Sequence, residues 1–165
     1  MSMADDLEGI RHTLATYNVN GDRLKLDGLA GAFLPDGVLE TPTGRLEGRA
    51  AIIEGLGGGR DKGKPVADPA RRPSFVRHNL TTSHLELTGP DTANGRTYFI
   101  VYTDIGADHM GYYVDRFRKV DGEWFIEHRR VMMDWMADNT LFVSNWDSYV
   151  KSRDELKARR MAAKG

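Results

Sequence analysis

The second half of the chain is a succession of predicted β-strands, and this pattern restricts the possible folds more than any other feature of the sequence. Long runs typical of strands cover residues 75–87, 96–104, 110–120 and 124–135. The turn-forming pairs Asn94-Gly95 and Asp121-Gly122 flank three of these runs. Four long strands joined by turns predict one strongly bent antiparallel sheet.

The first half of the chain has helical periodicity instead. Apolar residues recur at helical spacing from Leu7 to Tyr17, and either Asp5 or Asp6 is expected to cap this helix. The pattern further predicts helices over 26–33 and 49–56, a short strand over 38–41 with a hairpin return over 43–48, a loop over 57–73 and a basic amphipathic helix over 147–164. Helices followed by a bent sheet predict an α+β fold, whose concave face would hold a pocket.

The composition is that of a soluble globular protein forming a single domain over residues 1–165, with 40% hydrophobic and 28% charged residues. The formal net charge of -1 gives no general attraction to nucleic acid or anionic membranes. The absence of cysteine excludes thiol catalysis, thiolate metal sites and disulfides. The N-terminus lacks an apolar signal sequence, and no run approaches the roughly 20 apolar residues that span a bilayer. We therefore expect a cytoplasmic protein with neither nucleic acid nor membrane as a partner.

His78 is the histidine best suited to chemistry, because it lies near the start of the long strand over 75–87. A neutral imidazole titrates near pH 6.5, so it can take up a proton at working pH without large tuning. The alternative is a strand histidine that only makes a structural hydrogen bond. No set of His, Asp and Glu residues has metal-ligand spacing, so no metal is expected.

Several motifs, taken in order, resemble those of the nuclear-transport-factor-like α+β cone fold. They are Asp22 at the end of the first helix, Phe33-Leu34-Pro35-Asp36-Gly37, Arg77-His78, Tyr113-Val114-Asp115-Arg116-Phe117 and Asp121-Gly122-Glu123-Trp124. Over roughly residues 5–140 the chain is similar to the SnoaL-like branch, which holds scytalone dehydratase and hexachlorocyclohexane dehydrochlorinase. The resemblance implies a cone-shaped, curved antiparallel sheet wrapped around N-terminal helices, with a deep pocket.

The resemblance also implies a catalytic pair. In those enzymes a buried aspartate of the first helical segment orients a histidine that removes a proton from the substrate, and here Asp22 and His78 occupy the matching positions. Scytalone dehydratase has a second catalytic histidine one strand on, where this sequence offers Thr103. Dehydrochlorinase has an arginine on the last strand, where this sequence offers His128, two residues before Arg130. Because these partners differ, neither family reaction is assigned directly.

Simple alternation along the last strand places His128 and Arg130 on the same face as Trp124 and Ile126. If this face lines the pocket, Arg130 can hold a phenolate, a carboxylate or a leaving oxygen, and His128 can act as a second acid or base. The alternatives are an ion pair between Arg130 and Asp115 and a structural hydrogen bond for His128.

A large aromatic lining of the pocket would favour a bulky aromatic substrate. The candidate substrate-binding residues are Tyr98, Phe99, Val101, Thr103, Tyr113, Met132 and Trp135. His12 and His109 are expected at the surface.

Together these features predict a lyase that needs no cofactor, in which the His78–Asp22 pair abstracts a proton and an aromatic substrate expels water, halide or a carbon fragment. Relatives of this fold include lyases that release formaldehyde from lignin-derived aromatic dimers by a retro-aldol-like cleavage. The residues leave open which bond is broken. The alternatives are an isomerase or polyketide cyclase of the same fold, and a non-catalytic small subunit of a ring-hydroxylating dioxygenase. A homo-oligomer, dimer or trimer, is expected.

Overall fold

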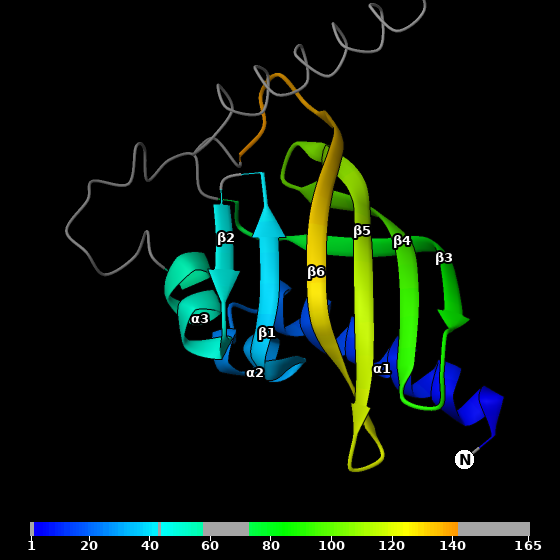
Figure 1. The fold of residues 1–165 in the computed structure, drawn as a ribbon. Coiled ribbons are helices and arrows are strands. Elements are labelled where there is room, and N and C mark those ends of the chain that lie inside the picture. Colours follow the sequence, from blue (N-terminus) through cyan, green and yellow to red (C-terminus); the bar gives the residue numbers. More distant parts are fainter. Residues whose placement is uncertain (1, 43, 58–72, 142–165) are drawn as a thin grey trace, which may run out of the picture.

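The computed structural model describes residues 2–42, 44–57 and 73–141 (Figure 1). Its elements are α1 (Met3–Asp22), α2 (Leu26–Gly31), β1 (Phe33–Thr41), β2 (Gly44–Glu47), α3 (Arg49–Gly57), β3 (Arg77–Leu87), β4 (Thr92–Thr103), β5 (Gly106–Val120) and β6 (Glu123–Met136). The α+β fold is confirmed. The helix predicted over 147–164 and most of the loop predicted over 57–73 lie outside the described residues.

The six strands form one open sheet in the order β2-β1-β6-β5-β4-β3. All neighbours are antiparallel except β1 and β6, which run parallel with Leu39 opposite Arg129. The four long strands predicted to form an antiparallel sheet, β3 to β6, are antiparallel, whereas the parallel pairing of β1 with β6 was not predicted. The chain leaves β1 through the hairpin to β2, crosses to the far edge at β3, and returns strand by strand until β6 lies beside β1 (Figure 1).

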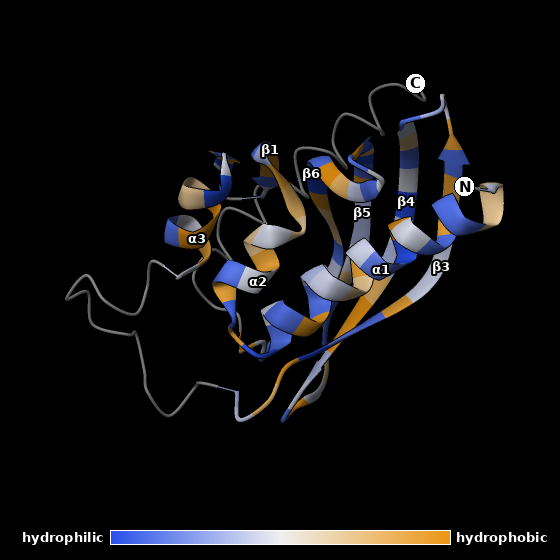
Figure 2. Ribbon diagram, turned by 90° about the horizontal axis from the view of Figure 1, so that it is seen from below, coloured by the Kyte–Doolittle hydropathy of each residue, from blue (hydrophilic) through white to orange (hydrophobic). Residues whose placement is uncertain are grey.

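Helix α1 crosses one face of the sheet (Figure 2), which is called the inner face below. Ser2 caps this helix, and not Asp5 or Asp6: the Ser2 hydroxyl accepts from the backbone N–H of Asp5, whose carboxylate accepts from the Ser2 N–H. Asp6 instead faces the sheet, where it accepts a hydrogen bond of 3.0 Å from the indole of Trp124. The buried core lies between α1 and the inner face. It includes Ile10, Leu14, Tyr17, Phe33, Phe99, Val101, Tyr113, Phe117 and Ile126.

The pair Asn94-Gly95 lies inside β4 and does not form a turn. A Cβ atom built at Gly95 would lie 2.8 Å from the ring of Phe117, so glycine is needed there to admit an aromatic side chain, not to reverse the chain. The second helix also ends earlier than predicted, because β1 begins at Phe33.

Strand β6 contains two single-residue irregularities in its pairing with β5. Ile126 and His128 face consecutive residues of β5, which leaves Glu127 between them as an extra residue. Met133 and Trp135 also face consecutive residues of β5, which leaves Asp134 as a second extra residue. Each extra residue reverses which side chains point to the inner face. The simple alternation expected along this strand is therefore wrong.

None of the helices that the structure describes is long and apolar enough to cross a membrane.

Candidate active site

Asp22 and His78 meet at one end of the inner face. Asp22 is the last residue of α1, and its Oδ1 lies 2.6 Å from Nδ1 of His78, near the start of β3. The backbone N–H of His78 also donates to Asp22, at 3.1 Å from Oδ2. The carboxylate thus fixes both the imidazole and the strand that carries it. The side chains are 22% exposed for His78 and 10% exposed for Asp22, so the pair is sheltered but still open to a ligand.

The tautomer of His78 follows from this contact. A carboxylate can only accept hydrogen bonds, so Nδ1 of His78 carries the hydrogen and the lone pair remains on Nε2. Asp22 would also stabilise the imidazolium formed when Nε2 takes up a proton. This arrangement would allow His78 to act as a general base.

His109 lies beside this pair, and the expectation that it is at the surface is wrong. Its residue is only 7% exposed, and its ring centroid lies 6.3 Å from that of His78. The register explains the approach: His78 on β3 pairs with Val101 on β4, which pairs with His109 on β5. His109 is therefore a second histidine near His78, two strands away, at a position other than that of Thr103, which the resemblance matched to the second histidine. Strand β5 begins at Gly106, earlier than the strand predicted over 110–120, so His109 lies inside it.

His109 has a carboxylate partner of its own. Its Nδ1 lies 2.8 Å from Oδ1 of Asp108, which is fully buried. Thr103 donates to the other oxygen of Asp108 at 3.2 Å. Burial lowers the pKa of His109, against the opposing effect of Asp108, and a charge on His78 lowers it further. Burial acts to raise the pKa of Asp108, but hydrogen bonds from Leu141, Thr140 and His109 outweigh it and lower that pKa.

Four of the predicted lining residues lie on the inner face: Phe99, Val101, Thr103 and Tyr113. The ring of Phe99 lies 6.1 Å from that of His78 and 6.2 Å from that of His109, and it stacks on Tyr113 at 4.7 Å. The phenol of Tyr113 donates to Asn18 at 3.1 Å. Burial raises the pKa of Tyr113 well above its usual value, so it remains a protonated donor. An aromatic wall thus joins the two histidines.

His128 and Arg130 do not lie on the inner face, which contradicts the prediction. The extra residue at Glu127 turns both outward, where they meet Glu40 of β1. Arg130 Nε lies 2.7 Å from one carboxylate oxygen of Glu40, and His128 Nε2 lies 3.3 Å from the other. The hydrogen bond from Arg130 is the main cause that lowers the pKa of Glu40 to about 2. In this position neither residue can oppose the His78–Asp22 pair.

Arg129 takes the place on the inner face that Arg130 was expected to occupy. Its guanidinium makes two hydrogen bonds to Asp115, of 2.8 and 2.7 Å, and lies 4.2 Å from the ring centre of Tyr17 and 3.9 Å from that of Tyr113. The residue is fully buried. The predicted ion pair with Asp115 exists, but its arginine is Arg129.

The other residues predicted to line the pocket do not lie on the inner face, so their prediction is also wrong. Met132 pairs with Tyr112 and Trp135 pairs with Met110, on the outer face of the sheet. Tyr98, opposite Tyr112 on β4, is on that face too. Between the two extra residues of β6, the side chains that pack against the core are those of Val131 and Met133.

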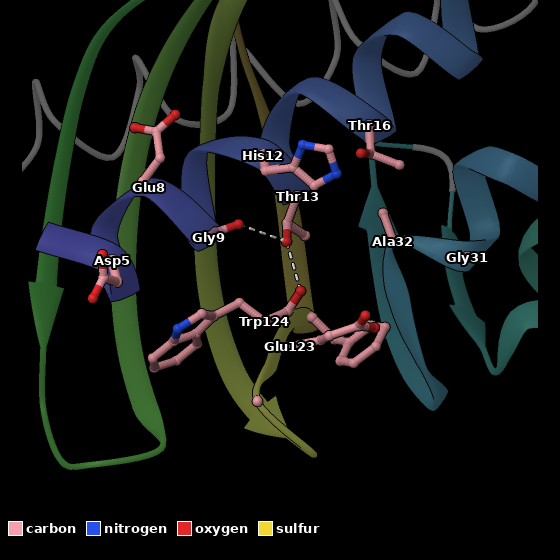
Figure 3. A pocket seen from close by; sticks show the side chains of 12 residues that line it. Asp5, Glu8, Gly9, His12, Thr13, Thr16, Gly31, Ala32, Glu123 and Trp124 are labelled. Atoms are coloured by element: carbon pink, nitrogen blue, oxygen red, sulfur yellow. Dashed lines mark hydrogen bonds between the residues drawn. The ribbon is translucent and has the colours of Figure 1, made fainter. Parts of the chain in front are cut away.

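A hollow of about 620 Å³ lies elsewhere, along the N-terminal part of α1 and the start of β6 (Figure 3). The hydroxyl of Thr13 donates to the carbonyl oxygens of Gly9 and Trp124, at 3.1 and 2.6 Å, and so ties the helix to the strand beside the hollow. None of the predicted site residues lines it. The deep pocket expected around His78 stays a prediction. Within the described ranges, no group of three or more His, Cys, Asp or Glu residues is placed to hold a metal ion.

Solved structures with the same fold were compared with the chain. A variant of Rv3472, a protein of unknown function from Mycobacterium tuberculosis, is 27% identical over 94% of this chain and 89% of its own, with a TM-score of 0.65. A candidate scytalone dehydratase from Novosphingobium aromaticivorans DSM 12444 is 20% identical over 81% of this chain and 87% of its own, with a TM-score of 0.67. The LinA-type3 hexachlorocyclohexane dehydrochlorinase from Novosphingobium barchaimii LL02 is 17% identical over 82% and 93%, with a TM-score of 0.65.

The likeness to the candidate scytalone dehydratase and to the dehydrochlorinase supports the fold alone. No curated protein matches the chain. The sequence itself matches the family model of the SnoaL-like domain over residues 2–130, which covers most of the described structure. The chain belongs to the SnoaL-like domain family.

Proposed function

We propose that the protein is a cofactor-independent lyase in which His78, oriented by Asp22, removes a proton from a bulky aromatic small molecule. The observation that carries this proposal is the 2.6 Å contact between His78 Nδ1 and Asp22 Oδ1, which leaves the lone pair of Nε2 for the substrate. Structures of the same fold include proteins named as dehydratase and dehydrochlorinase, and both names denote eliminations.

In the proposed elimination, Nε2 of His78 takes the proton and the electrons of the broken bond form a new double bond. The leaving group departs with its bonding pair. A halide leaves as the anion, whereas hydroxide needs a proton, which the imidazolium of His78 can return to it. In a retro-aldol-like reaction the same base would take the proton of a hydroxyl, and a carbon–carbon bond would break as formaldehyde forms. The electron pair of that bond would form a new carbon–carbon double bond as a neighbouring hydroxyl leaves as water, with the proton returned by the imidazolium of His78. A lignin-derived aromatic dimer is a substrate of that kind.

His109 would assist as a second base or hydrogen-bond acceptor. Its lowered pKa favours the neutral imidazole at pH 7, and Asp108 accepts the hydrogen bond of its Nδ1. The separation of 6.3 Å between the two ring centroids lets one reacting group contact both imidazoles. Phe99 and Tyr113 would supply the aromatic wall against which the substrate lies.

The two facing imidazoles also favour a second candidate, an isomerase or cyclase that moves a proton between two atoms of one substrate. The two functions differ in their products. A lyase releases water, halide or an aldehyde, whereas an isomerase releases nothing and incorporates deuterium from heavy water.

The experiment that tests the proposal is a screen of aromatic diols, halides and hydroxylated aromatic dimers without added cofactor. His78→Ala and Asp22→Asn should each lower the turnover number about 10²- to 10⁴-fold. The matched control is His84→Ala, since His84 is an exposed histidine on the same strand. Full turnover by His78→Ala on a confirmed substrate would overturn the proposal.

A further inference from the structure

The chain that follows β6 returns to β5 and makes several hydrogen bonds to Asp108 there. The backbone N–H of Ala137 donates to the carbonyl oxygen of Asp108 at 2.8 Å. The hydroxyl of Thr140 donates to Oδ1 of Asp108 at 2.5 Å, and the backbone N–H of Leu141 donates to Oδ2 at 2.9 Å. Thr140 is buried like Asp108 itself. Residues 137–141 are called the return segment below.

The same carboxylate oxygen serves the return segment and the second histidine. Oδ1 of Asp108 accepts from Thr140 and also contacts Nδ1 of His109 at 2.8 Å. Donors that share one carboxylate oxygen compete for its negative charge, so each added donor weakens the hold on the others. Asp108 therefore connects the return segment to the imidazole of His109, which faces His78.

We propose that Thr140 and Leu141 are positioning residues that act on His109 through Asp108, so that docking of the return segment sets how readily His109 takes up a proton. The importance of this effect for catalysis rests on the proposed function. The linkage between the return segment and the pKa of His109 does not depend on that function. With the segment docked, two extra donors draw charge from Asp108, and an imidazolium at His109 is less stabilised. His109 then remains a neutral base. With the segment displaced, the carboxylate of Asp108 would keep only the hydrogen bonds from Thr103 and His109 among its described contacts, so more of its charge would act on His109.

The charges around His109 make the direction clear. Asp108 on its own strand favours the imidazolium, and His78 on β3 opposes it. Asp22 of α1 is bonded to His78 and lies behind it. The neighbours of His109 in the sheet, Val101 and Met136, carry no charge. Among the described contacts of His109, the one to Asp108 is therefore the contact that the return segment affects.

The test is a pH titration of the histidine ring nitrogens of the full chain by NMR, which needs no substrate. Thr140→Val keeps the side-chain shape but removes one donor to Asp108, and Leu141→Pro removes the other. Each variant should raise the pKa of His109 by about half a pH unit to one pH unit, the size expected for one hydrogen bond. Thr140→Ser, which keeps the hydroxyl, should restore the wild-type value.

The matched control is Thr97→Val, because Thr97 is a fully buried threonine whose hydroxyl bonds Ser83 and not Asp108. This variant should leave the pKa of His109 unchanged. An unchanged pKa of His109 in both Thr140→Val and Leu141→Pro would overturn the linkage. The two proposals fail separately: if His78→Ala retains turnover while Thr140→Val raises the pKa of His109, the lyase proposal falls and the linkage stands.

Discussion

His78 and His109 present their rings to one another at 81° between planes, and each is held at Nδ1 by its own carboxylate. The two imidazoles come from β3 and β5, and only Val101 of β4 separates them in the register. The two oriented imidazoles therefore lie next to one another, and a role for His109 can be tested separately from the role proposed for His78.

Replacing His109 by glutamine should lower the turnover number about 10²-fold or more if it contacts the reacting group. Glutamine retains a hydrogen-bonding side chain of similar size, so the effect would reflect lost basicity. Turnover is measured on the substrate found by the screen. His12→Gln, at an exposed position on α1, should retain full turnover. Equal turnover of His109→Gln and the wild type would show that His109 has no part in the chemistry.

The stability of the protein should depend on the protonation of His109. Its pKa in the folded state lies below the ordinary value of about 6.5, because burial disfavours the charged ring. The unfolded chain therefore binds this proton more readily. The free energy of unfolding should be fully retained above about pH 6.5 and should fall as the pH drops through the pKa of the folded state. Urea denaturation across this range measures the loss, which His109→Gln should reduce and His12→Gln should not.

Arg129 and Arg130 should differ sharply in their importance for stability. Arg129→Met leaves the carboxylate of Asp115 buried without its partner and should cost about 3–5 kcal/mol. Arg130→Met breaks an ion pair with Glu40 on the outer face, where the arginine side chain is 55% exposed, and should cost about 0–1 kcal/mol. Denaturant unfolding of both variants checks this. If their losses are similar, the assignment of faces along β6 is wrong.

Gly111 should not tolerate even a methyl group. A Cβ atom there would collide with the carbonyl oxygen of Met132 in the neighbouring strand. Gly111→Ala should therefore lower the free energy of unfolding by about 1–3 kcal/mol, through displacement of backbone. Gly31→Ala is the control, because a Cβ there meets nothing within 4 Å and α2 would gain up to about 1 kcal/mol. Thermal unfolding that ranks the two variants in the opposite order would contradict the packing described.

We propose that the outer face of the sheet is where copies of the chain associate as a homo-oligomer. Large apolar side chains are exposed there, and such patches mark interaction sites. They are those of Tyr98, Tyr102, Val114 and Trp135. Trp135→Glu should lower the mass measured by sedimentation to that of a monomer. Met3→Glu, at an exposed apolar residue away from this face, should not. A monomeric wild type would refute the proposal.

The sequence sufficed for the parts of the site that depend on local pattern. Local pattern located Asp22 at the end of a periodic helix and His78 near the start of a β-branched strand, and the resemblance to the SnoaL-like branch implied that the two are paired. The faces of β6 could not be predicted, because an extra residue such as Glu127 leaves no mark in the sequence and inverts the side chains that follow it, as far as the next extra residue. His109 was missed for a related reason: the strand that carries it begins earlier than its turn-like residues suggest.

The pairing of β1 with β6 brings residues of the first quarter of the chain against those of the last. Leu39 is synthesised about ninety residues before its partner Arg129, so this contact has a high sequence separation. On the ribosome β1 would wait with an unpaired edge until β6 emerges. We therefore expect slow, late closure of the sheet, and premature truncation within β6 should produce chains that aggregate.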